Sequence, residues 1–410
     1  MVKHQSPLGY RIVSAFVLLA GLSVAVTGDD KPADSTKAGT HNSCRLILPP
    51  VVYAVAGTEL NLYFQNLILT PPGRVWIFDV SCAKGKHQVE RWTWLPTDED
   101  AGDLPLALEV RDADDKVVAI GKTTIRVARK TAGQGQPLRL LCIGDSGTHA
   151  SAYTAELMKS CAGPEQPRLE LIGTHHPPFA GPGNVHEGYG GWTFQNFVEK
   201  YTDKPIPGDH ANRSSPFVFG TPSGPVFDVP RYVKESCGGV PPDYVTMFLG
   251  ANELARIVSN AGNSDLPDLD EKIAGVLDYA DKLIAGWRAA APKAKIGLVT
   301  MYPPTNQDGF GANYGSSRLK YWPYRKAQHR LVEMMIAKYG RRVDDGLYVI
   351  PSYLMLDTEH AFPTESVPAN SRTSEKVTRI SNALHLASGY AQLSDSIFGW
   401  LKCPAQSGEP

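Results

Sequence analysis

Between residues 137 and 403, short apolar runs alternate with segments whose apolar residues recur every three or four positions. The apolar runs predict five strands, which are Leu138–Ile143, Leu169–Ile172, Tyr244–Leu249, Ile296–Thr300 and Leu347–Ile350. Helical patterns cover Leu269–Ala290, the region of Leu331, Met334 and Met335, and the region of Tyr390, Leu393, Ile397 and Leu401. Strands that alternate with helices form parallel sheets covered on both faces. The pattern predicts an α/β domain whose ligands bind at the carboxyl ends of its strands.

The preceding stretch, from Cys44 to about Arg129, has a hydrophobic period of two. Apolar and polar residues alternate in three runs, which carry Leu60, Leu62 and Phe64, then Trp76, Phe78 and Val80, then Leu106, Leu108 and Val110. Glycine, proline and aspartate separate the runs, as in turns between short strands. We predict an all-β domain of the immunoglobulin-like sandwich type over residues 43–130, followed by a Gly- and Gln-rich linker.

The first 28 residues have the composition of a secretory signal peptide. Lys3 and Arg11 precede a largely apolar run from Ile12 to Val26, and a polar linker over residues 29–42 follows it. The run is shorter than the roughly 20 residues that a membrane-spanning helix needs, so we predict cleavage and no stable membrane span. The protein is therefore expected to be secreted or periplasmic.

Composition limits the partners and the redox chemistry. The formal net charge is −1 over 410 residues and no basic stretch stands out, so nucleic-acid binding is not expected. A chain of this length suits two domains. The six cysteines could pair in an exported protein, but the sequence does not choose among the possible connectivities. Cys142 lies inside a predicted strand, where we expect a buried free thiol.

A serine follows the first predicted strand of the α/β domain, in the motif Gly144-Asp145-Ser146-Gly147-Thr148. A helical pattern begins a few residues later, so Ser146 stands at a strand-to-helix turn. Its hydroxyl is then exposed at the carboxyl edge of the sheet, where backbone N–H groups can face developing negative charge. The motif alone is weak evidence, because serine is also common as a helix N-cap.

Three further blocks follow in order along the chain. They are Glu187-Gly188-Tyr189-Gly190-Gly191-Trp192, then Gly250-Ala251-Asn252-Glu253, then Asn382-Ala383-Leu384-His385. With the serine motif, they make the sequence resemble the SGNH/GDSL hydrolase superfamily over about residues 138–401. The resemblance implies a flavodoxin-like three-layer fold with the strand order 2-1-3-4-5.

The resemblance also implies a role for each block. Ser146 matches the nucleophile, and His385 matches the general base that takes its proton and returns it to the leaving alcohol. The backbone N–H groups of Ser146 and Gly191 and the side-chain amide of Asn252 match the oxyanion hole. Trp192 adjoins Gly191, and we expect it to contact the substrate.

Two positions depart from the family pattern. Glu253 replaces the usual Asp, at a position that does not enter the chemistry directly. Asn382 stands three residues before His385, where the family usually has Asp. We include Asn382 among the catalytic residues because its oxygen could hold the imidazole tautomer, although it carries no charge. The alternatives are a Ser-His dyad or another carboxylate, such as Asp357 or Glu359.

Other kinds of site fit less well. Gly-Asp-Ser-Gly also surrounds the nucleophile of trypsin-like proteases, but the strand-helix alternation disagrees with a double β-barrel. The Gly-x-Ser-x-Gly elbow of α/β-hydrolases does not occur. His149, His175, His176 and His186 could suggest a metal site, yet no acidic ligands stand nearby at zinc spacing. We therefore predict neither a metal nor a cofactor.

These patterns favour an exported esterase for short-chain acyl esters, with O-acetyl groups on carbohydrate as the preferred substrate. The added β-domain and the aromatic residues in two long loops, 173–242 and 302–324, support a glycan substrate by analogy. A lipase or lysophospholipase is the alternative enzyme, although no long apolar acyl groove is evident. A catalytically silent glycan-binding protein is the alternative from another class. The oligomeric state stays open.

Overall fold

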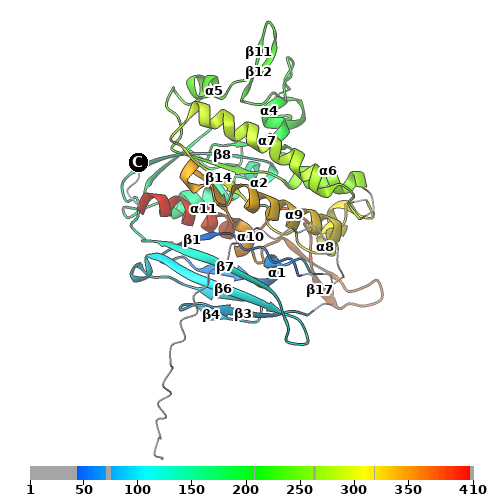
Figure 1. Ribbon diagram of the computed structural model, residues 1–410. Helices are drawn as coiled ribbons and strands as arrows, with labels where there is room; N and C mark the ends of the chain where they lie inside the picture. Colours follow the sequence, from blue (N-terminus) through cyan, green and yellow to red (C-terminus); the bar gives the residue numbers. More distant parts are fainter. Residues whose placement is uncertain (1–43, 71–74, 207, 262–264, 318, 407–410) are drawn as a thin grey trace, which may run out of the picture. The chain divides into compact units, whose positions relative to one another are not determined.

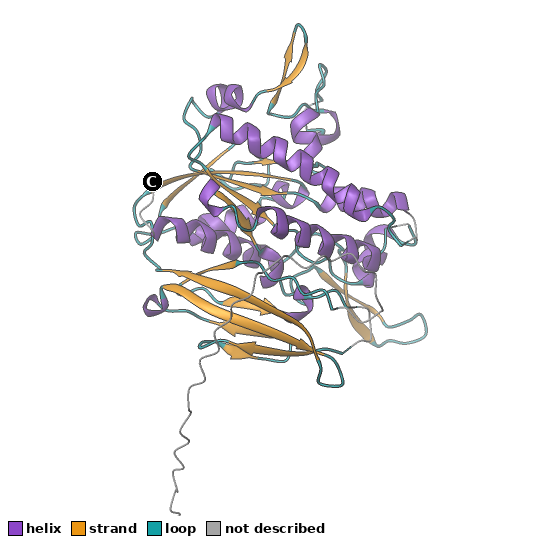
Figure 2. Ribbon diagram, viewed as in Figure 1, coloured by secondary structure: helices purple, strands orange, loops and turns teal. Residues whose placement is uncertain are grey.

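The computed structural model describes residues 44–70, 75–206, 208–261, 265–317 and 319–406. The predicted signal peptide and the polar linker after it lie outside the described residues. The described residues fall in one compact unit. Its architecture changes between β7, which ends at Ala128, and β8, which begins at Pro137 (Figures 1 and 2).

The N-terminal part consists of two β-sheets around a shared apolar core. One sheet has the order β1-β7-β6-β3 and the other has the order β2-β5-β4. The elements are β1 Val51–Val55, β2 Leu60–Tyr63, α1 Phe64–Leu67, β3 Ile77–Ser81, β4 Lys86–His87, β5 Arg91–Trp94, β6 Gly102–Arg111 and β7 Val117–Ala128, with the 3-10 turn η1 at Asp98–Asp100. Phe64 begins α1 instead of continuing β2, so the alternating run is one residue shorter than predicted. An immunoglobulin-like topology stays a prediction.

The α/β part is built on a parallel sheet with the strand order β9-β8-β13-β14-β15. Counted along the chain, this is the order 2-1-3-4-5 that the sequence resemblance implies. The strands are β8 Pro137–Gly144, β9 Arg168–Ile172, β13 Tyr244–Phe248, β14 Lys295–Val299 and β15 Leu347–Ile350, and a two-residue strand, β10 Glu187–Gly188, pairs with the end of β8. The five predicted strands are confirmed to within one residue at each end.

Helices cover both faces of this sheet, with α7 and α11 on opposite sides (Figure 1). The helix α3 packs against α11, whereas α4, α5 and α9 pack against α7. The helices are α2 Ser146–His149, α3 Ala152–Ser160, α4 Phe194–Glu199, α5 Val229–Ser236, α6 Ala251–Ala261, α7 Leu269–Ala290, α8 Gln307–Tyr314, α9 Tyr321–Tyr339, α10 Ser352–Met355 and α11 Gly389–Gln406, and the 3-10 turns are η2 His210–Asn212 and η3 Val343–Asp345. The bounds of α7 are those that the period predicts.

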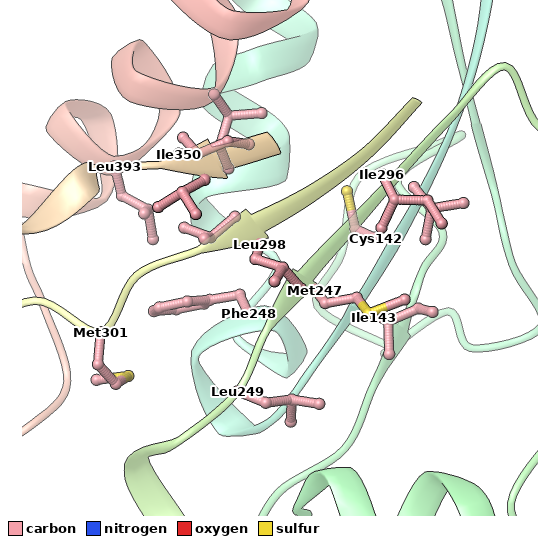
Figure 3. Packing of buried hydrophobic residues seen from close by; sticks show 14 of the residues in the cluster. Cys142, Ile143, Met247, Phe248, Leu249, Ile296, Leu298, Met301, Ile350 and Leu393 are labelled. Atoms are coloured by element: carbon pink, nitrogen blue, oxygen red, sulfur yellow. The ribbon is translucent and has the colours of Figure 1, made fainter. Parts of the chain in front are cut away.

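The central strands are buried on both faces, which explains why apolar residues predominate in them. Figure 3 shows side chains of Ile143, Met247 and Leu298 packed together from three neighbouring strands. Cys142 is fully buried and unpaired, as predicted. All six cysteines lie in the described part of the chain, and none forms a disulfide there.

The two long loops carry short elements of their own. The first contains α4, α5, η2 and the hairpin of β11 (Val218–Thr221) and β12 (Gly224–Phe227), and the second contains α8. A further hairpin, β16 (Thr364–Pro368) with β17 (Lys376–Ile380), precedes the His385 block. Across the described residues, no helix combines the length and the apolar character needed to cross a bilayer.

Buried hydrogen bonds join the N-terminal sheets to the α/β part. Arg325 of α9 is 5% exposed and donates to the backbone carbonyls of Gln65 and Ile68, each at 3.0 Å. In return, the Asn66 amide donates to the carbonyls of Tyr353 and Leu356 at 2.9 and 2.8 Å. Arg325 thus satisfies carbonyl groups at the end of α1 that have no partner within that helix.

Candidate active site

Ser146 is the first residue of α2, directly after β8 and the helix cap Asp145. The Asp145 carboxylate accepts the Gly147 N–H at 2.9 Å, which fixes the turn. This turn is too tight for side chains at two glycines. A Cβ on Gly144 would lie 2.1 Å from Thr148 Oγ1, and a Cβ on Gly188 would lie 2.6 Å from Thr148 Cγ2. Glycine at both positions therefore allows α2 to lie against the sheet edge.

A cavity of about 320 Å³ lies beside this turn. Four of the predicted site residues line it: Ser146, Asn252, Asn382 and His385. They come from four segments that are up to about 240 positions apart, and the parallel sheet brings their strand ends together. The cavity is also lined by Asp145, Gly147, Phe248, Ala251, Met301, Tyr302, Asn313, Tyr314 and Leu384. No hydrogen bond joins Ser146 Oγ to the His385 ring among the described residues, and such contacts often tighten only when substrate binds.

The His385 ring has a tyrosine as its partner. His385 Nδ1 lies 3.3 Å from the hydroxyl oxygen of Tyr390 on α11. Asn382 does not hold the ring directly. Its Oδ1 accepts the backbone N–H groups of Leu384 and His385 at 3.1 and 2.8 Å, so its side chain shapes the turn that carries the histidine. Burial lowers the pKa of His385, which favours the neutral imidazole that a general base requires.

The carboxylates considered from the sequence lie elsewhere. Asp357 Oδ2 is 3.0 Å from His360 Nδ1, and Tyr63 donates to the same oxygen at 3.3 Å. Glu359 is exposed. Among the described residues, the structure therefore gives no carboxylate contact to the His385 ring.

Asn252 is fixed by two acceptors. Its Nδ2 donates to the carbonyl of Trp192 at 2.9 Å and approaches Asp145 Oδ2 at 3.4 Å. The longer contact is the weaker one. The Nδ2 hydrogen that faces Asp145 is therefore the one that can turn toward a substrate oxygen in the cavity.

The loop that carries Gly191 is held from the α6 side as well. Glu253 accepts the Phe194 N–H at 2.8 Å, and Arg256 Nη2 lies 3.4 Å from the Gly191 carbonyl oxygen. Gly191 has a φ of +79°, which favours glycine. It is exposed next to Trp192, although it does not line the cavity itself. Three side chains of α6, including Asn252, thus hold this loop.

Trp192 is a correction to the sequence analysis. It is 2% exposed and packs between Tyr189 and Phe197, with ring centroids 4.5 and 5.0 Å away. Its indole N–H donates to the carbonyl of His210 at 2.8 Å. The side chain is therefore buried structure that holds the loop, and it offers no surface to a substrate.

His210 holds the same loop from the other side. Its Nδ1 accepts the Gly190 N–H at 2.8 Å, next to its carbonyl contact with Trp192. Arg213 lies over the Tyr189 ring, 4.0 Å from its centroid. The turn η2 and the residue after it thus hold the Gly190 N–H and the side chains of Tyr189 and Trp192, on either side of the predicted oxyanion glycine.

Three imidazoles gather here, from His149, His175 and His210, with ring nitrogens within 4.8 Å of one another. These residues could hold a cation, but their present contacts are hydrogen bonds. His149 Nδ1 lies 2.9 Å from His175 Nε2, in rings tilted by 20°. A histidine that ligates a metal donates its second N–H, whereas His210 Nδ1 accepts the N–H of Gly190. Its proton therefore resides on Nε2, so ligation would require a change of tautomer and the loss of that bond.

Two buried carboxyl groups lie behind the cavity. Burial raises the pKa of Asp145 from 3.8 to about 7 and that of Glu253 from 4.5 to about 7. The N–H groups of Gly147 and Phe194 oppose the shifts without cancelling them. Burial thus favours the protonated form of both carboxyl groups more than exposure to water would.

Sequence reasoning missed Tyr390, His210 and the role of Glu253. The sequence pattern indicates Tyr390 only as an apolar residue of the last helix. His210 lies in a segment without hydrophobic periodicity, so no pattern marks it. Glu253 was visible as a departure beside Asn252. Its extra methylene, compared with Asp, would have been the signal that this side chain reaches a neighbouring loop.

Comparisons with known proteins give a fold-level likeness only. No family model matches the chain, and no curated protein matches it. Solved structures that it resembles include a possible lipase from Chitinophaga pinensis DSM 2588 (14% identity, 64% of this chain and 96% of that chain, TM-score 0.33). An acetylxylan esterase from Geobacillus stearothermophilus has 16% identity, with 65% and 94% covered and a TM-score of 0.32. An alpha/beta hydrolase enzyme from the metagenome of Lake Arreo has 16% identity, with 67% and 99% covered and a TM-score of 0.34. These low scores carry no argument about function.

Proposed function

We propose that the protein is an exported serine esterase of the SGNH/GDSL type, with Ser146 as its nucleophile. The observation that carries the proposal is that Ser146, Asn252 and His385 line one cavity. A hydroxyl, an imidazole and an amide donor at the carboxyl edge of a parallel sheet are the groups that acyl transfer requires.

In the proposed reaction, His385 Nε2 takes the proton of Ser146 as Oγ attacks the ester carbonyl. The backbone N–H groups of Ser146 and Gly191 and the Asn252 amide then stabilise the oxyanion. His385 returns the proton to the leaving alcohol, and the acyl group stays on Ser146. Water then attacks the acyl-enzyme while His385 takes its proton, and Ser146 Oγ leaves and regains that proton as the acid is released. Nε2 can act as a base only if Nδ1 keeps its hydrogen, which requires Nδ1–H to donate to the Tyr390 oxygen.

Short acyl groups on carbohydrate are the proposed substrates. A cavity of about 320 Å³ is at the small end of ligand sites, which favours an acetyl group over a long acyl chain. A lipase or lysophospholipase would need a longer apolar channel beside Ser146. Secretion to the periplasm or the cell exterior remains part of the proposal because of the N-terminal sequence.

Hydrolysis of p-nitrophenyl acetate, octanoate and palmitate tests the proposal, using protein without its first 28 residues. We expect the acetate to be the best substrate, and the activity to vanish in Ser146→Ala but not in the hairpin control Ser223→Ala. A fluorophosphonate probe should label the wild-type protein and Ser223→Ala, but not Ser146→Ala. A folded protein that neither turns over an ester nor reacts with the probe would overturn the general esterase proposal and favour the glycan-binding alternative or a narrowly specific enzyme.

A further inference from the structure

A groove of about 960 Å³ lies between the N-terminal sheets and the loops of the α/β part. Aromatic side chains form one wall, where Phe64 and Phe78 stack with ring centroids 4.7 Å apart, and Trp76 lines the groove beside them. The segment Pro303–Asn306 contributes to the opposite wall. A volume of this size at the boundary between two architectures is typical of a ligand site.

Buried side-chain oxygens of groove residues lack a hydrogen-bond partner in the described part of the chain, and Oγ1 of Thr70 is one of them. The two on more deeply buried residues are Oδ1 of Asn66, which is 1% exposed, and Oγ1 of Thr305, which is 4% exposed. Buried polar atoms are normally paired, because leaving one unpaired costs folding free energy. Both residues line the groove, so hydroxyl groups of a bound ligand could supply the missing donors.

The charges of the lining disfavour an anionic ligand. Three of the charged groups already have protein partners, which are Arg325 with backbone carbonyls, Asp308 with Arg379, and His360 with Asp357. The exposed carboxylates of Glu90 and Glu359 also line the groove. The groove therefore offers aromatic faces and hydrogen-bond acceptors, which match the apolar faces and hydroxyl groups of a sugar.

Segments that line the groove continue into segments that line the candidate catalytic cavity. Ile380, at the end of β17, lines the groove, and His385, five residues later, lines the catalytic cavity. Asn306 at the start of α8 faces the groove, whereas Tyr314 at the end of the same helix faces the cavity. The groove and the cavity are therefore lined by connected segments of the chain.

We propose that this groove binds an uncharged oligosaccharide chain that carries the ester cleaved at Ser146. The proposal rests on the proposed function for the ester, but the binding itself needs no catalysis. It assigns a substrate-binding role to Asn66, Thr305 and the aromatic wall around Trp76.

Calorimetric titration of Ser146→Ala protein with unacetylated xylohexaose, cellohexaose and mannohexaose tests the groove separately from the chemistry. We expect at least one of them to bind with a Kd below about 1 mM. Thr305→Val removes the unpartnered hydroxyl at nearly constant shape and should weaken binding about three- to tenfold. Trp76→Ala should weaken it about tenfold or more. Thr154→Val is the matched control, since Thr154 Oγ1 is also buried and unpartnered but lies in α3, away from the groove.

Binding that weakens in Thr305→Val and Trp76→Ala, but not in Thr154→Val, supports the proposal. The proposal is overturned if none of the three sugars binds, or if the Kd is the same in the wild-type groove and in both groove variants. Either result leaves the esterase assignment intact. Binding of spermidine in place of the sugars also overturns it, because the acceptors would then serve a cation. Conversely, sugar binding by a protein whose wild-type form cleaves no ester keeps the groove and refutes the proposed function.

Discussion

The imidazole of His385 lies beside a neutral hydroxyl, where many serine hydrolases place a carboxylate. A carboxylate stabilises the imidazolium that forms during the reaction, and in a serine protease its replacement by an amide costs about 10⁴-fold in turnover. The Tyr390 hydroxyl can fix the ring and its tautomer but supplies no full charge. We therefore expect a modest turnover with a ring orientation that depends on this tyrosine.

Tyr390→Phe tests that dependence. Removing the hydroxyl leaves Nδ1 without its partner, so kcat for p-nitrophenyl acetate should fall about tenfold while KM stays unchanged. Tyr279→Phe, which removes a hydroxyl from the exposed surface of α7, is the control and should keep the wild-type kcat. Equal kcat values in all three proteins would show that the tyrosine does not position the base.

If His385 is the base, as proposed, its lowered pKa should set the acid limit of activity. The base works only when neutral, and burial lowers the pKa of His385 from the ordinary value of 6.5. The acid limb of kcat/KM against pH should therefore have its midpoint below 6.5. A midpoint above that value would contradict burial as the dominant influence and indicate a nearby anion.

At the scale of elements, the loop before α4 is held between α6 and η2. Asn252, Glu253 and Arg256 contact it from one side, and His210 contacts it from the other. Such a clamp fixes the loop around Gly191, and the proposed oxyanion role of its N–H group requires a donor that is in place before the substrate arrives.

His210 variants test the clamp. His210→Ala removes the acceptor for Gly190, and the resulting displacement of the loop should lower kcat about ten- to a hundredfold. His210→Asn can present Oδ1 near the position of Nδ1 and should recover part of the loss. The control is His176→Asn, since His176 is exposed and outside the cluster. If the Ala and Asn variants behave alike, the hydrogen bond to Gly190 is not the cause.

Glu253 links the same clamp to pH. The folded protein holds a proton on Glu253 up to a pH of about 7, whereas the unfolded chain loses it near 4.5. The unfolded chain thus binds fewer protons in this window, so the free energy of unfolding falls as the pH rises through it. Glu253→Gln should match the wild-type Tm at about pH 5 and exceed it at about pH 8. Thermal unfolding of both proteins, with exposed Glu271→Gln as the control, checks this; a Tm difference that does not change with pH would refute it.

For the whole molecule, we expect Arg325 to contribute to the attachment of the N-terminal sheets to the α/β part. Arg325→Leu leaves the carbonyls of Gln65 and Ile68 buried without donors, so the free energy of unfolding should fall by about 2–3 kcal/mol. Arg330→Leu, on the same helix, breaks more exposed ion pairs and should cost less than about 1 kcal/mol. Urea denaturation measures both, and equal losses would contradict a special role for Arg325.

The sequence predicted the α/β sheet well because burial imposes a simple pattern. Tyr244–Phe248 has water on neither face, so its residues are apolar apart from the buried Thr246. The helix Leu269–Ala290 buries one side, so its apolar residues follow the helical period. Both signals are local and can be seen without knowing any tertiary contact.

The site was less predictable because its geometry depends on contacts between distant segments. The motifs located Ser146, Asn252 and His385, which do line one cavity. They could not show that Asn382 bonds backbone groups rather than the ring, since that depends on the turn geometry. Trp192 illustrates the opposite error, because an aromatic residue in a loop has the same sequence signal whether it is buried or exposed.

The six unpaired cysteines have a consequence for where this fold can be made and kept. Burial raises the pKa of the thiols of Cys142, Cys161 and Cys237 to about 11 and that of Cys403 to about 12, so almost none is a thiolate at neutral pH. Oxidants and disulfide exchange act on thiolates. The fold contains no disulfide among the described residues, so we expect the chain to reach it without an oxidising catalyst and these four thiols to react slowly with oxidants once it has folded.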